Sequence, residues 1–389
     1  MAGLRPTSSD ELCEAIADAA ARGLSLDIRG GGSKAAIGAP RESEILDMTG
    51  FSGVIDYAPA ELILVAGAGT PLAEVEALVA GQGQMLAFEP FDPAPLFGER
   101  PGRATIGGAV AAGIAGSRRL SAGGVRDHLL GFAAVSGRGE AIAGGARVVK
   151  NVTGYDLPKL LAGSWGRLAA LTSVTLKVLP RPRASATLAI EGLGSEQAQA
   201  AMDAAMASNV EVAAAAHLPA AGGEPARTLF RLAGFEPSVE ARCALLPILL
   251  GEFGRVMLLA ADEAESLWRT VRDVTPLAGD RPLWRMVVPT SRGGEVAVSL
   301  DERGGDWLLD WAGGLVWACH DDVAAVRAIA RAVGGHASLI RGPVALRART
   351  PFLDPPMPGV ARLAERVRRA FDPAGVFETG RFLDDEDAD

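Results

Sequence analysis

Cysteine is scarce in this chain, and the cysteines that occur form no motif. The 389 residues include three of them, spaced far apart and with no CxxC pair: Cys13, Cys243 and Cys319. This spacing excludes a disulfide framework and contains no zinc or iron–sulfur motif. We therefore expect a reducing compartment and no metal centre.

An excess of positive charge and long apolar runs are also missing. The formal net charge is −9, and the basic residues are scattered. No patch therefore indicates nucleic-acid binding or a polybasic membrane anchor. The N-terminus has no apolar leader, and runs such as "ALLPILLGEF" are too short or too polar to cross a bilayer. We expect a cytoplasmic protein without a transmembrane segment. A peripheral position at the inner face of the cell membrane, reached through a complex, stays open.

Glycine is abundant, with 48 residues, and the first glycine-rich stretch follows a short strand. A capping box from Ser8 to Glu11 begins a helix that ends at Gly23, and "LSLDI" then predicts a strand leading into "RGGGSK". Three glycines in a row leave φ free and let successive N–H groups point into one concavity. The loop from Arg29 to Lys34 is therefore typical of a phosphate site at the carboxyl end of a strand.

Two further glycine-rich stretches indicate a ligand longer than one phosphate group. The second, "RATIGGAVAAGIAGSRRLSAGG", removes side chains over a long path and leaves Thr105 and Ser117 as hydroxyl donors. The third, "LAGSWGRLAALTSVTLKV", places Gly163 and Gly166 at a predicted helix-to-strand turn. Apolar residues recur between these glycines, which argues against flexible linkers.

The stretch "GAGTPLAEVEALVAG" predicts a strand end and a helix, with Thr70 as N-cap and Pro71 at the first helical position. The same letters approach a dinucleotide fingerprint, with Glu89 about 20 residues further on. However, Leu72 replaces the third glycine, where helix and strand would pack closest. We therefore assign no NAD site to this stretch.

The order of these motifs resembles the vanillyl-alcohol-oxidase type, also called PCMH-type, of FAD-binding domain. The resemblance covers residues 1 to about 185 and returns at "RRAFDPAGVFETGRF". Four later stretches, "LFRLAGFEPSVEARC", "PLWRMVVPTSRG", "WLLDWAGGLVWA" and "GGHASLIR", extend it to nearly the whole chain. Over that length the chain is similar to the family of smaller, FAD-binding subunits of bacterial glycolate oxidases.

The resemblance implies an α+β protein in three parts. Residues 1–185 would form a PCMH-type FAD-binding domain of two α/β subdomains, and residues 186–340 an α+β cap domain. Residues 341–389 would return to the FAD domain and end in an acidic, disordered tail, "DDEDAD". In the cap, Trp307 and Trp311 are four apart, which fits either one helix face or two strands around a turn. We expect these tryptophans to serve core packing, and the alternative is a subunit interface or a lid above the flavin.

The resemblance also implies which residues hold FAD. The first loop would bind the pyrophosphate, the second stretch would line the flavin and ribityl chain, and the third would complete the wall. The implied residues are Arg29, Gly30, Gly31, Gly32, Ser33, Lys34, Thr105, Ile106, Gly107, Gly108, Gly113, Gly116, Ser117, Gly163, Ser164, Gly166 and Val174.

Two departures from the family pattern affect the cofactor. Many members attach the flavin through a histidine in the first loop, whereas Ser33 and Lys34 follow the glycines here, so we expect noncovalent FAD. The usual C-terminal asparagine–proline–glycine–arginine is replaced by Glu378, Thr379, Gly380 and Arg381. A contact from the first of these positions to the isoalloxazine is therefore open.

Catalytic residues are harder to assign. The larger 2-hydroxy-acid dehydrogenases that resemble this chain hold a metal with closely spaced histidines, but its four histidines are widely separated. His128, in the segment "VRDHLLGF" that continues the second glycine stretch, is the candidate among them for a catalytic residue. Arg285 and Arg341 stand among apolar residues and are candidates for binding a substrate carboxylate. For each arginine a salt bridge or an exposed strand edge is the favoured interpretation.

Three hypotheses follow for the function. The favoured one is an FAD-carrying subunit of a glycolate oxidase, which relays electrons between a larger flavoprotein subunit and an iron–sulfur subunit during oxidation of glycolate to glyoxylate. The second is a stand-alone FAD-dependent 2-hydroxy-acid dehydrogenase. The third is a scaffold subunit with a vestigial FAD site.

Overall fold

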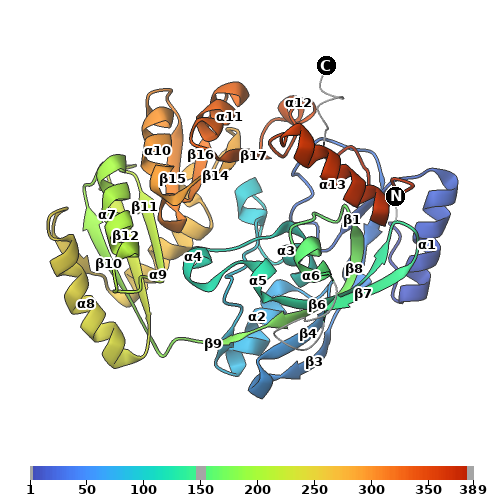
Figure 1. The fold of residues 1–389 in the computed structure, drawn as a ribbon, viewed down its shortest axis with the longest axis horizontal. Helices are drawn as coiled ribbons and strands as arrows, with labels where there is room; N and C mark the ends of the chain where they lie inside the picture. Colours follow the sequence, from blue (N-terminus) through green and yellow to red (C-terminus); the bar gives the residue numbers. More distant parts are fainter. Residues whose placement is uncertain (1–2, 146–154, 383–389) are drawn as a thin grey trace.

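The N-terminal part of the chain is built on a five-stranded antiparallel sheet. The computed structural model describes residues 3–145 and 155–382 (Figure 1). The strand order is β3-β4-β8-β6-β7, with β8 between β4 and β6. The strands are β3 (Val54–Ala58), β4 (Ile63–Gly67), β6 (Leu129–Ser136), β7 (Ala141–Gly145) and β8 (Ala169–Lys177). Two small pairs accompany the sheet: parallel β1 (Leu26–Arg29) with β2 (Glu44–Asp47), and antiparallel β5 (Gln84–Met85) with β9 (Leu179–Pro180).

Short helices join these strands, and their ends test the capping predictions. Helix α1 (Ser9–Arg22) begins where the Ser8 side chain accepts from Glu11 N and ends at left-handed Gly23, as predicted. The prediction for α2 (Leu72–Gly81) is wrong at its start, because Pro71 is the N-cap. The Thr70 hydroxyl instead donates to Gly67 O at 2.6 Å. The remaining helices here are η1 (Met48–Gly50), η2 (Pro59–Glu61), η3 (Ala94–Phe97), α3 (Ile106–Ala112), α4 (Arg119–Ala122), α5 (Val125–His128) and α6 (Leu157–Leu161).

The following part forms an eight-stranded antiparallel sheet made of two βαββαβ units. The strand order is β13-β10-β12-β11-β15-β16-β14-β17. The first unit contains β10 (Ala184–Glu191), α7 (Ser195–Ala207), β11 (Ala214–Leu218), β12 (Arg227–Gly234), α8 (Glu236–Leu250) and β13 (Val256–Leu258). The second contains β14 (Leu283–Val287), α10 (Gly293–Asp301), β15 (Asp306–Asp310), β16 (Leu315–Cys319), α11 (Val323–Ala332) and β17 (His336–Arg341). The units join edge to edge, where His217 of β11 pairs with Leu309 of β15. Each unit has the ferredoxin-like order of elements.

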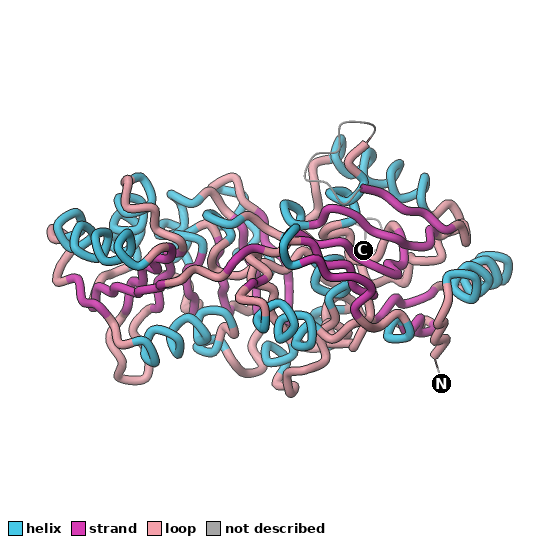
Figure 2. The backbone as a smooth tube through the Cα atoms, turned by 90° about the horizontal axis from the view of Figure 1, so that it is seen from below, coloured by secondary structure: helices cyan, strands magenta, loops and turns pink. Residues whose placement is uncertain are grey.

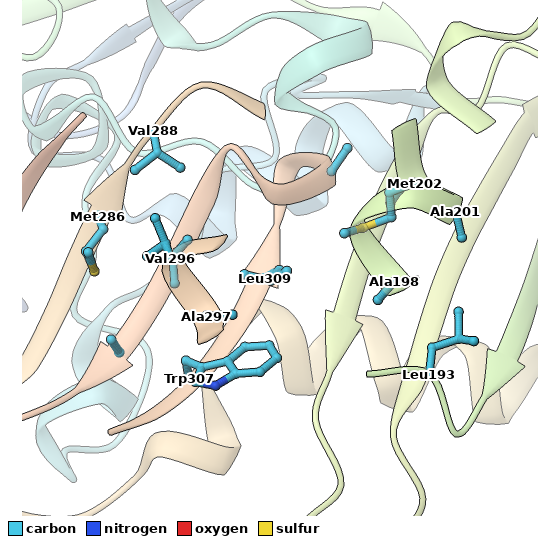
Figure 3. Close-up of a cluster of buried hydrophobic side chains, with 14 of the residues drawn as sticks. Leu193, Ala198, Ala201, Met202, Met286, Val288, Val296, Ala297, Trp307 and Leu309 are labelled. Atoms are coloured by element: carbon cyan, nitrogen blue, oxygen red, sulfur yellow. The ribbon is translucent and has the colours of Figure 1, made fainter. Parts of the chain in front are cut away.

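The two faces of this sheet are covered differently, and Figure 2 shows its strands between helices. Helices α7, α8, α10 and α11 pack on one face around a core that includes Met202, Trp307 and Leu309 (Figure 3). On the other face, α9 (Ala261–Arg272) and η4 (Thr275–Leu277) pack together with residues of the N-terminal part. Trp307 lies in β15 and Trp311 in the turn η6 (Trp311–Gly313) before β16, so the pattern is two strands around a turn. One further short helix, η5 (Thr290–Arg292), precedes α10.

The C-terminal segment crosses back to the N-terminal part. After α12 (Val344–Arg347) and α13 (Pro358–Phe371), Val376 and Phe377 pack with residues of α1, β1 and β2. The backbone of Leu26 donates to Val376 O at 2.7 Å. The sequence-based boundaries at residues 185 and 340 fall inside β10 and β17. The acidic end, residues 383–389, and residues 146–154 of the third motif lie outside the described residues. Among the described helices, none is both long and apolar enough to cross a membrane.

Candidate functional site

A cavity lies where the first two glycine-rich stretches meet. It encloses about 720 Å³ of empty space, part of it open to solvent. It lies between the loop after β1, the start of α3 and the turn before β8. Ten of the residues implied by the family resemblance line it: Arg29, Gly30, Gly31, Gly32, Ser33, Lys34, Thr105, Gly107, Gly108 and Gly166.

The loop after β1 offers hydrogen-bond donors that the rest of the described chain does not use. The backbone N–H groups of Gly31, Gly32, Ser33 and Lys34 have no acceptor among residues 3–145 and 155–382. Gly32 has a φ of 78°, in the left-handed region. Consecutive free N–H groups around such a residue form an anion-binding concavity. The first cavity therefore has unpaired donors in the place where the sequence predicts a phosphate.

Four basic residues also line this cavity: Arg29, Lys34, Arg41 and Arg381. They come from separate parts of the sequence, so no single motif contains all four. Arg29 and Arg41 both pair with buried Asp27, at 2.7 and 2.9 Å. Burial lowers the pKa of Lys34 to about 8, and nearby Arg381 acts in the same direction. Burial also lowers the pKa of Arg381 to about 9, with Arg41 adding to the effect. Because each cation raises the cost of charging the next, a bound anion would stabilise all of them.

Arg381 ties the C-terminal segment to the loop after β1. Its guanidinium donates to Ile37 O at 3.0 Å and to Lys34 O at 2.5 Å. It also stacks over the ring of Trp165, with 5.3 Å to the ring centroid. Glu378 lines neither cavity and is paired with Arg167 and Arg368. Of the C-terminal signature, the arginine therefore lies at the site and the first position does not.

Several glycines are required by the fold itself, as well as by a ligand. A Cβ on Gly31 would lie 1.7 Å from Arg103 O, and one on Gly107 would lie 2.6 Å from the Ala68 Cβ. At Gly113 it would approach the Gly163 Cα to 3.2 Å. The three glycine stretches are thus packed backbone against backbone. A Cβ on Gly108 would project toward Lys34 Nζ, at 3.5 Å, inside the cavity.

A second cavity adjoins the first, with Lys34, Ala112 and Trp165 lining both. It encloses about 900 Å³ of empty space, part of it open to solvent, and lies between the second glycine stretch and the eight-stranded sheet. Gly113, Gly116 and Arg285 line it. The two cavities together form one elongated space along the glycine-rich stretches.

A strained turn of the second βαββαβ unit reaches the wall of this second cavity. Trp311 and Ala312 have φ values of 51° and 52°, which nonglycine residues rarely adopt. Trp311 Nε1 donates to Gly116 O at 2.9 Å, and Ser117 Oγ donates to Asp310 Oδ2 at 2.9 Å. Burial raises the pKa of Asp310 to about 7. The turn therefore holds a buried carboxyl group next to the second glycine stretch.

The other predicted residues lie outside both cavities. Ile106 and Val174 are buried in the core around β4 and β8, and Ser117 is paired with Asp310. Gly163 and Ser164 form the turn after α6, where Gly163 N donates to Val110 O. His128 has a structural position, with Nε2 2.8 Å from Ala122 O. Arg341 is also structural, because it donates to the carbonyls of Leu96, Leu277 and Arg281.

Sequence reasoning missed three residues of the site, each for a physical reason. Arg41 lies in a loop without any motif, although its basic charge near the first glycine loop was a usable signal. Trp165 lies between the glycines of the third stretch and has a φ of 57°. Asp310 reaches the second glycine stretch only through the pairing of distant strands, which no local pattern reveals.

The residues fit FAD on observations of this structure. Free N–H groups and four cations in the first cavity suit a diphosphate. The second cavity, with Trp317, Ile340 and Phe352 among its apolar lining, suits a planar ring system. FAD supplies two-electron redox chemistry when bound.

Comparisons with known proteins agree with this geometry. Residues 2–145 match the model of an FAD binding domain. The chain is 33% identical over 378 residues to the glycolate oxidase subunit GlcE of Escherichia coli (strain K12), covering 96% of this chain and 97% of that protein. It is 31% identical over 188 residues to a D-lactate dehydrogenase of Archaeoglobus fulgidus, covering 48% of this chain and 40% of that enzyme.

Among solved structures, an alkyldihydroxyacetonephosphate synthase matches with a TM-score of 0.67 at 14% identity, over 96% of this chain and 76% of that one. At this identity the match establishes the fold alone. The GlcE match extends over nearly the full length of both chains. The chain thus belongs to the family of FAD-linked oxidoreductase subunits that contains the glycolate oxidase subunit GlcE.

Proposed function

We propose that this chain carries a noncovalent FAD in the two adjoining cavities and works as the FAD-binding subunit of a glycolate oxidase. The free N–H groups from Gly31 to Lys34 carry the proposal, because four consecutive donors without a protein acceptor line a partly buried cavity, where they can bind an anion. The diphosphate would lie on this loop, and the flavin would extend past Trp165 along Gly113 and Gly116. In this assignment the N-terminal part and the C-terminal segment form the FAD domain, and the eight-stranded sheet forms the cap.

The first glycine loop supports noncovalent attachment. It contains neither histidine nor cysteine, and among the described residues that line the two cavities the one histidine is His336, on β17 of the cap. Lys34 Nζ lies 3.4 Å from Ser33 Oγ and has no carboxylate partner among the described residues. The Lys34 ammonium is therefore available to neutralise a phosphate or the reduced flavin.

Electron relay is the role that we assign to this flavin. GlcE is named as a subunit, which supports partner subunits for this chain as well. We propose that the partners are a larger FAD-linked subunit and an iron–sulfur subunit, and that the complex lies in the cytoplasm or at the inner face of the cell membrane. The retained cavity and its free donors argue against a scaffold with a vestigial site.

The visible spectrum of the purified chain tests this proposal. We expect a flavin spectrum with stoichiometric FAD, and release of all the flavin into the supernatant on acid precipitation. A yellow precipitate would contradict noncovalent attachment. A chain that neither retains nor takes up FAD would contradict the proposed function.

A further inference from the structure

Arg285 is a cation in the wall of the second cavity that lacks a protein partner. No described residue accepts a hydrogen bond from its guanidinium or forms an ion pair with it. Its guanidinium lies over the ring of Trp311, with 5.1 Å from the guanidinium carbon to the ring centroid, and Asp310 and Arg119 act on it only through their charges. Arg341, on the neighbouring strand, donates instead to three carbonyl oxygens. A guanidinium has five N–H donors, and those of the partly buried Arg285 are left for a ligand or solvent in the cavity.

The strand register places Arg285 at the centre of the cavity wall. Its direct cross-strand neighbours are Trp317 on β16 and Ser338 on β17, and both line the cavity. His336 and Ile340 follow on the same face of β17, two residues to either side of Ser338. The guanidinium therefore faces the space between the sheet and the second glycine stretch.

The composition of the wall indicates the kind of ligand. The charged or titratable residues that line this cavity are Lys34, Arg272, Arg285, Asp310 and His336. Arg272 is paired with Asp273, outside the lining, whereas Lys34 and Arg285 have no carboxylate partner in the described chain. Apolar side chains form most of the remaining wall. A small anion fits such a site better than a cation or a neutral polar molecule.

We propose that Arg285 binds the carboxylate of a small organic acid, in a site on this chain beside the flavin. The planar guanidinium suits a carboxylate through two parallel hydrogen bonds. The proposal rests on the proposed function only for the position of the flavin. An acid bound here would lie beside the flavin of this same chain. Electrons could then enter the relay at this subunit.

Titration of the FAD-loaded chain with oxalate, a dicarboxylate that cannot be oxidised as a 2-hydroxy acid, tests the site. We expect saturable binding by calorimetry and a shift of the flavin absorption bands. Arg285→Met should raise the dissociation constant at least about tenfold with its FAD content unchanged, and Arg285→Lys should have a smaller effect. Arg292→Met is the matched control, since Arg292 is exposed and paired with Glu295. Unchanged oxalate affinity in Arg285→Met would overturn the proposal.

A second measurement does not depend on a variant. Phenylglyoxal modifies accessible arginines, and peptide mass spectrometry can read the modification of Arg285 in the FAD-loaded wild-type chain. Oxalate should protect Arg285 and leave Arg292 unprotected, and equal modification with and without oxalate would overturn the proposal. If Arg285→Met instead loses its FAD, Arg285 contacts the flavin and the acid site is wrong, although the proposed FAD function stands. If the wild-type chain holds no FAD, the proposed function is wrong. The acid site is then tested separately, by calorimetric titration of the FAD-free chain with oxalate.

Discussion

The hydroxyl of Ser117 donates to the Asp310 carboxylate at 2.9 Å, although 193 residues separate them in the chain. Both residues are buried. The neighbouring bond from Trp311 Nε1 to Gly116 O, also 2.9 Å, fixes the same turn on the same stretch. Two hydrogen bonds with buried partners thus hold the second βαββαβ unit against the glycine-rich wall of the second cavity. Changes at Asp310 should therefore affect both stability and the second cavity.

Replacing Asp310 by asparagine should make the protein less sensitive to pH. Burial raises the pKa of Asp310 from 3.8 to about 7, so the folded protein holds a proton that the unfolded chain loses at a lower pH. The wild type therefore loses stability as pH rises from about 4 to about 7, by at most about 1.4 kcal/mol per pH unit. The asparagine side chain has no charge to bury and can still accept a hydrogen bond. The quantity to measure is the melting temperature of Asp310→Asn minus that of the wild type. We expect this difference to be larger at pH 8 than at pH 5.

The matched control for this experiment is Asp321→Asn. Asp321 is exposed, and its nearest cation, in Arg281, is 4.0 Å away. Its substitution should change the melting temperature equally at the two pH values. A difference between wild type and Asp310→Asn that stays constant from pH 5 to pH 8 would show that the Asp310 carboxyl does not titrate in this range.

A single methyl group at Gly108 should separate cofactor binding from folding. The added Cβ would lie inside the first cavity, 3.5 Å from the mobile end of Lys34 and 3.1 Å from Thr105 Oγ1. Alanine also favours a helix by about 1 kcal/mol over glycine, and Gly108 lies within α3. We expect Gly108→Ala to keep its melting temperature without FAD, yet to bind FAD at least about tenfold more weakly.

Gly81→Ala is the control, because the space around Gly81 is open. It should leave FAD affinity unchanged. Gly31→Val should behave differently from both, since its Cβ would overlap Arg103 O. We expect that variant to lose both FAD and thermal stability. Full FAD affinity in Gly108→Ala would place the cofactor away from α3.

The glycine stretches illustrate how far sequence reasoning reaches. Their clustering predicts one site for a long ligand, and the structure brings all three stretches to adjoining cavities. Yet the reason for individual glycines is often internal packing, as at Gly107 against Ala68. A sequence cannot distinguish a glycine that admits a ligand from one that admits another backbone, because both remove the same side chain.

Local signals placed one helix cap correctly and another wrongly. The Ser8 hydroxyl caps α1 by accepting from Glu11 N within the same turn, as predicted. Thr70 failed as a cap because its hydroxyl bonds to Gly67 and Gly53, on the strand side of the turn. The pairing of Asp310 with Ser117 and the edge-to-edge pairing of the two βαββαβ units depend on distant strands, so no sequence window contains them.

Removing the Arg381 guanidinium should make the loop after β1 less rigid. Arg381 donates to Ile37 O and Lys34 O, and a hydrogen bond to a charged group contributes about 1.5–3 kcal/mol. We expect Arg381→Met to bind FAD at least about tenfold more weakly and to melt at a lower temperature. Arg381→Lys should not restore affinity, because an ammonium cannot reproduce the planar fork over Trp165.

Arg369→Met on α13 controls for loss of charge. Arg369 is exposed and pairs only with Glu365 among the described residues. Its replacement should leave FAD affinity unchanged. Equal affinities for wild type and Arg381→Met would show that the C-terminal arginine does not shape the loop.

The last prediction concerns the relay itself. If this flavin passes electrons between partners, glycolate should reduce it in the isolated chain at least about a hundredfold more slowly than in the assembled complex. The structural reason is that neither Asp310 nor His336, the two possible bases among the described lining of the second cavity, is well suited to take a proton from glycolate. Hydrogen bonds from Ser117 Oγ and Trp311 N hold Asp310 on the second glycine stretch, and its raised pKa of about 7 leaves the carboxyl partly protonated at neutral pH. Burial lowers the pKa of His336, which weakens it as a base. A well-placed base contributes about 10²–10⁴ to such a rate.

Anaerobic stopped-flow measurement of flavin bleaching decides the question. Slow bleaching together with oxalate binding means that the acid enters this chain but reacts efficiently only in the complex. Fast bleaching in the isolated chain, lost in Arg285→Ala, would overturn the relay and make the chain a dehydrogenase in its own right. Arg341→Ala separates the two causes of a lost signal, because Arg341 lines neither cavity and its guanidinium donates to three backbone carbonyls. We expect Arg341→Ala to melt at a lower temperature than the wild type. Its rate of flavin bleaching should depend on glycolate concentration as the wild-type rate does.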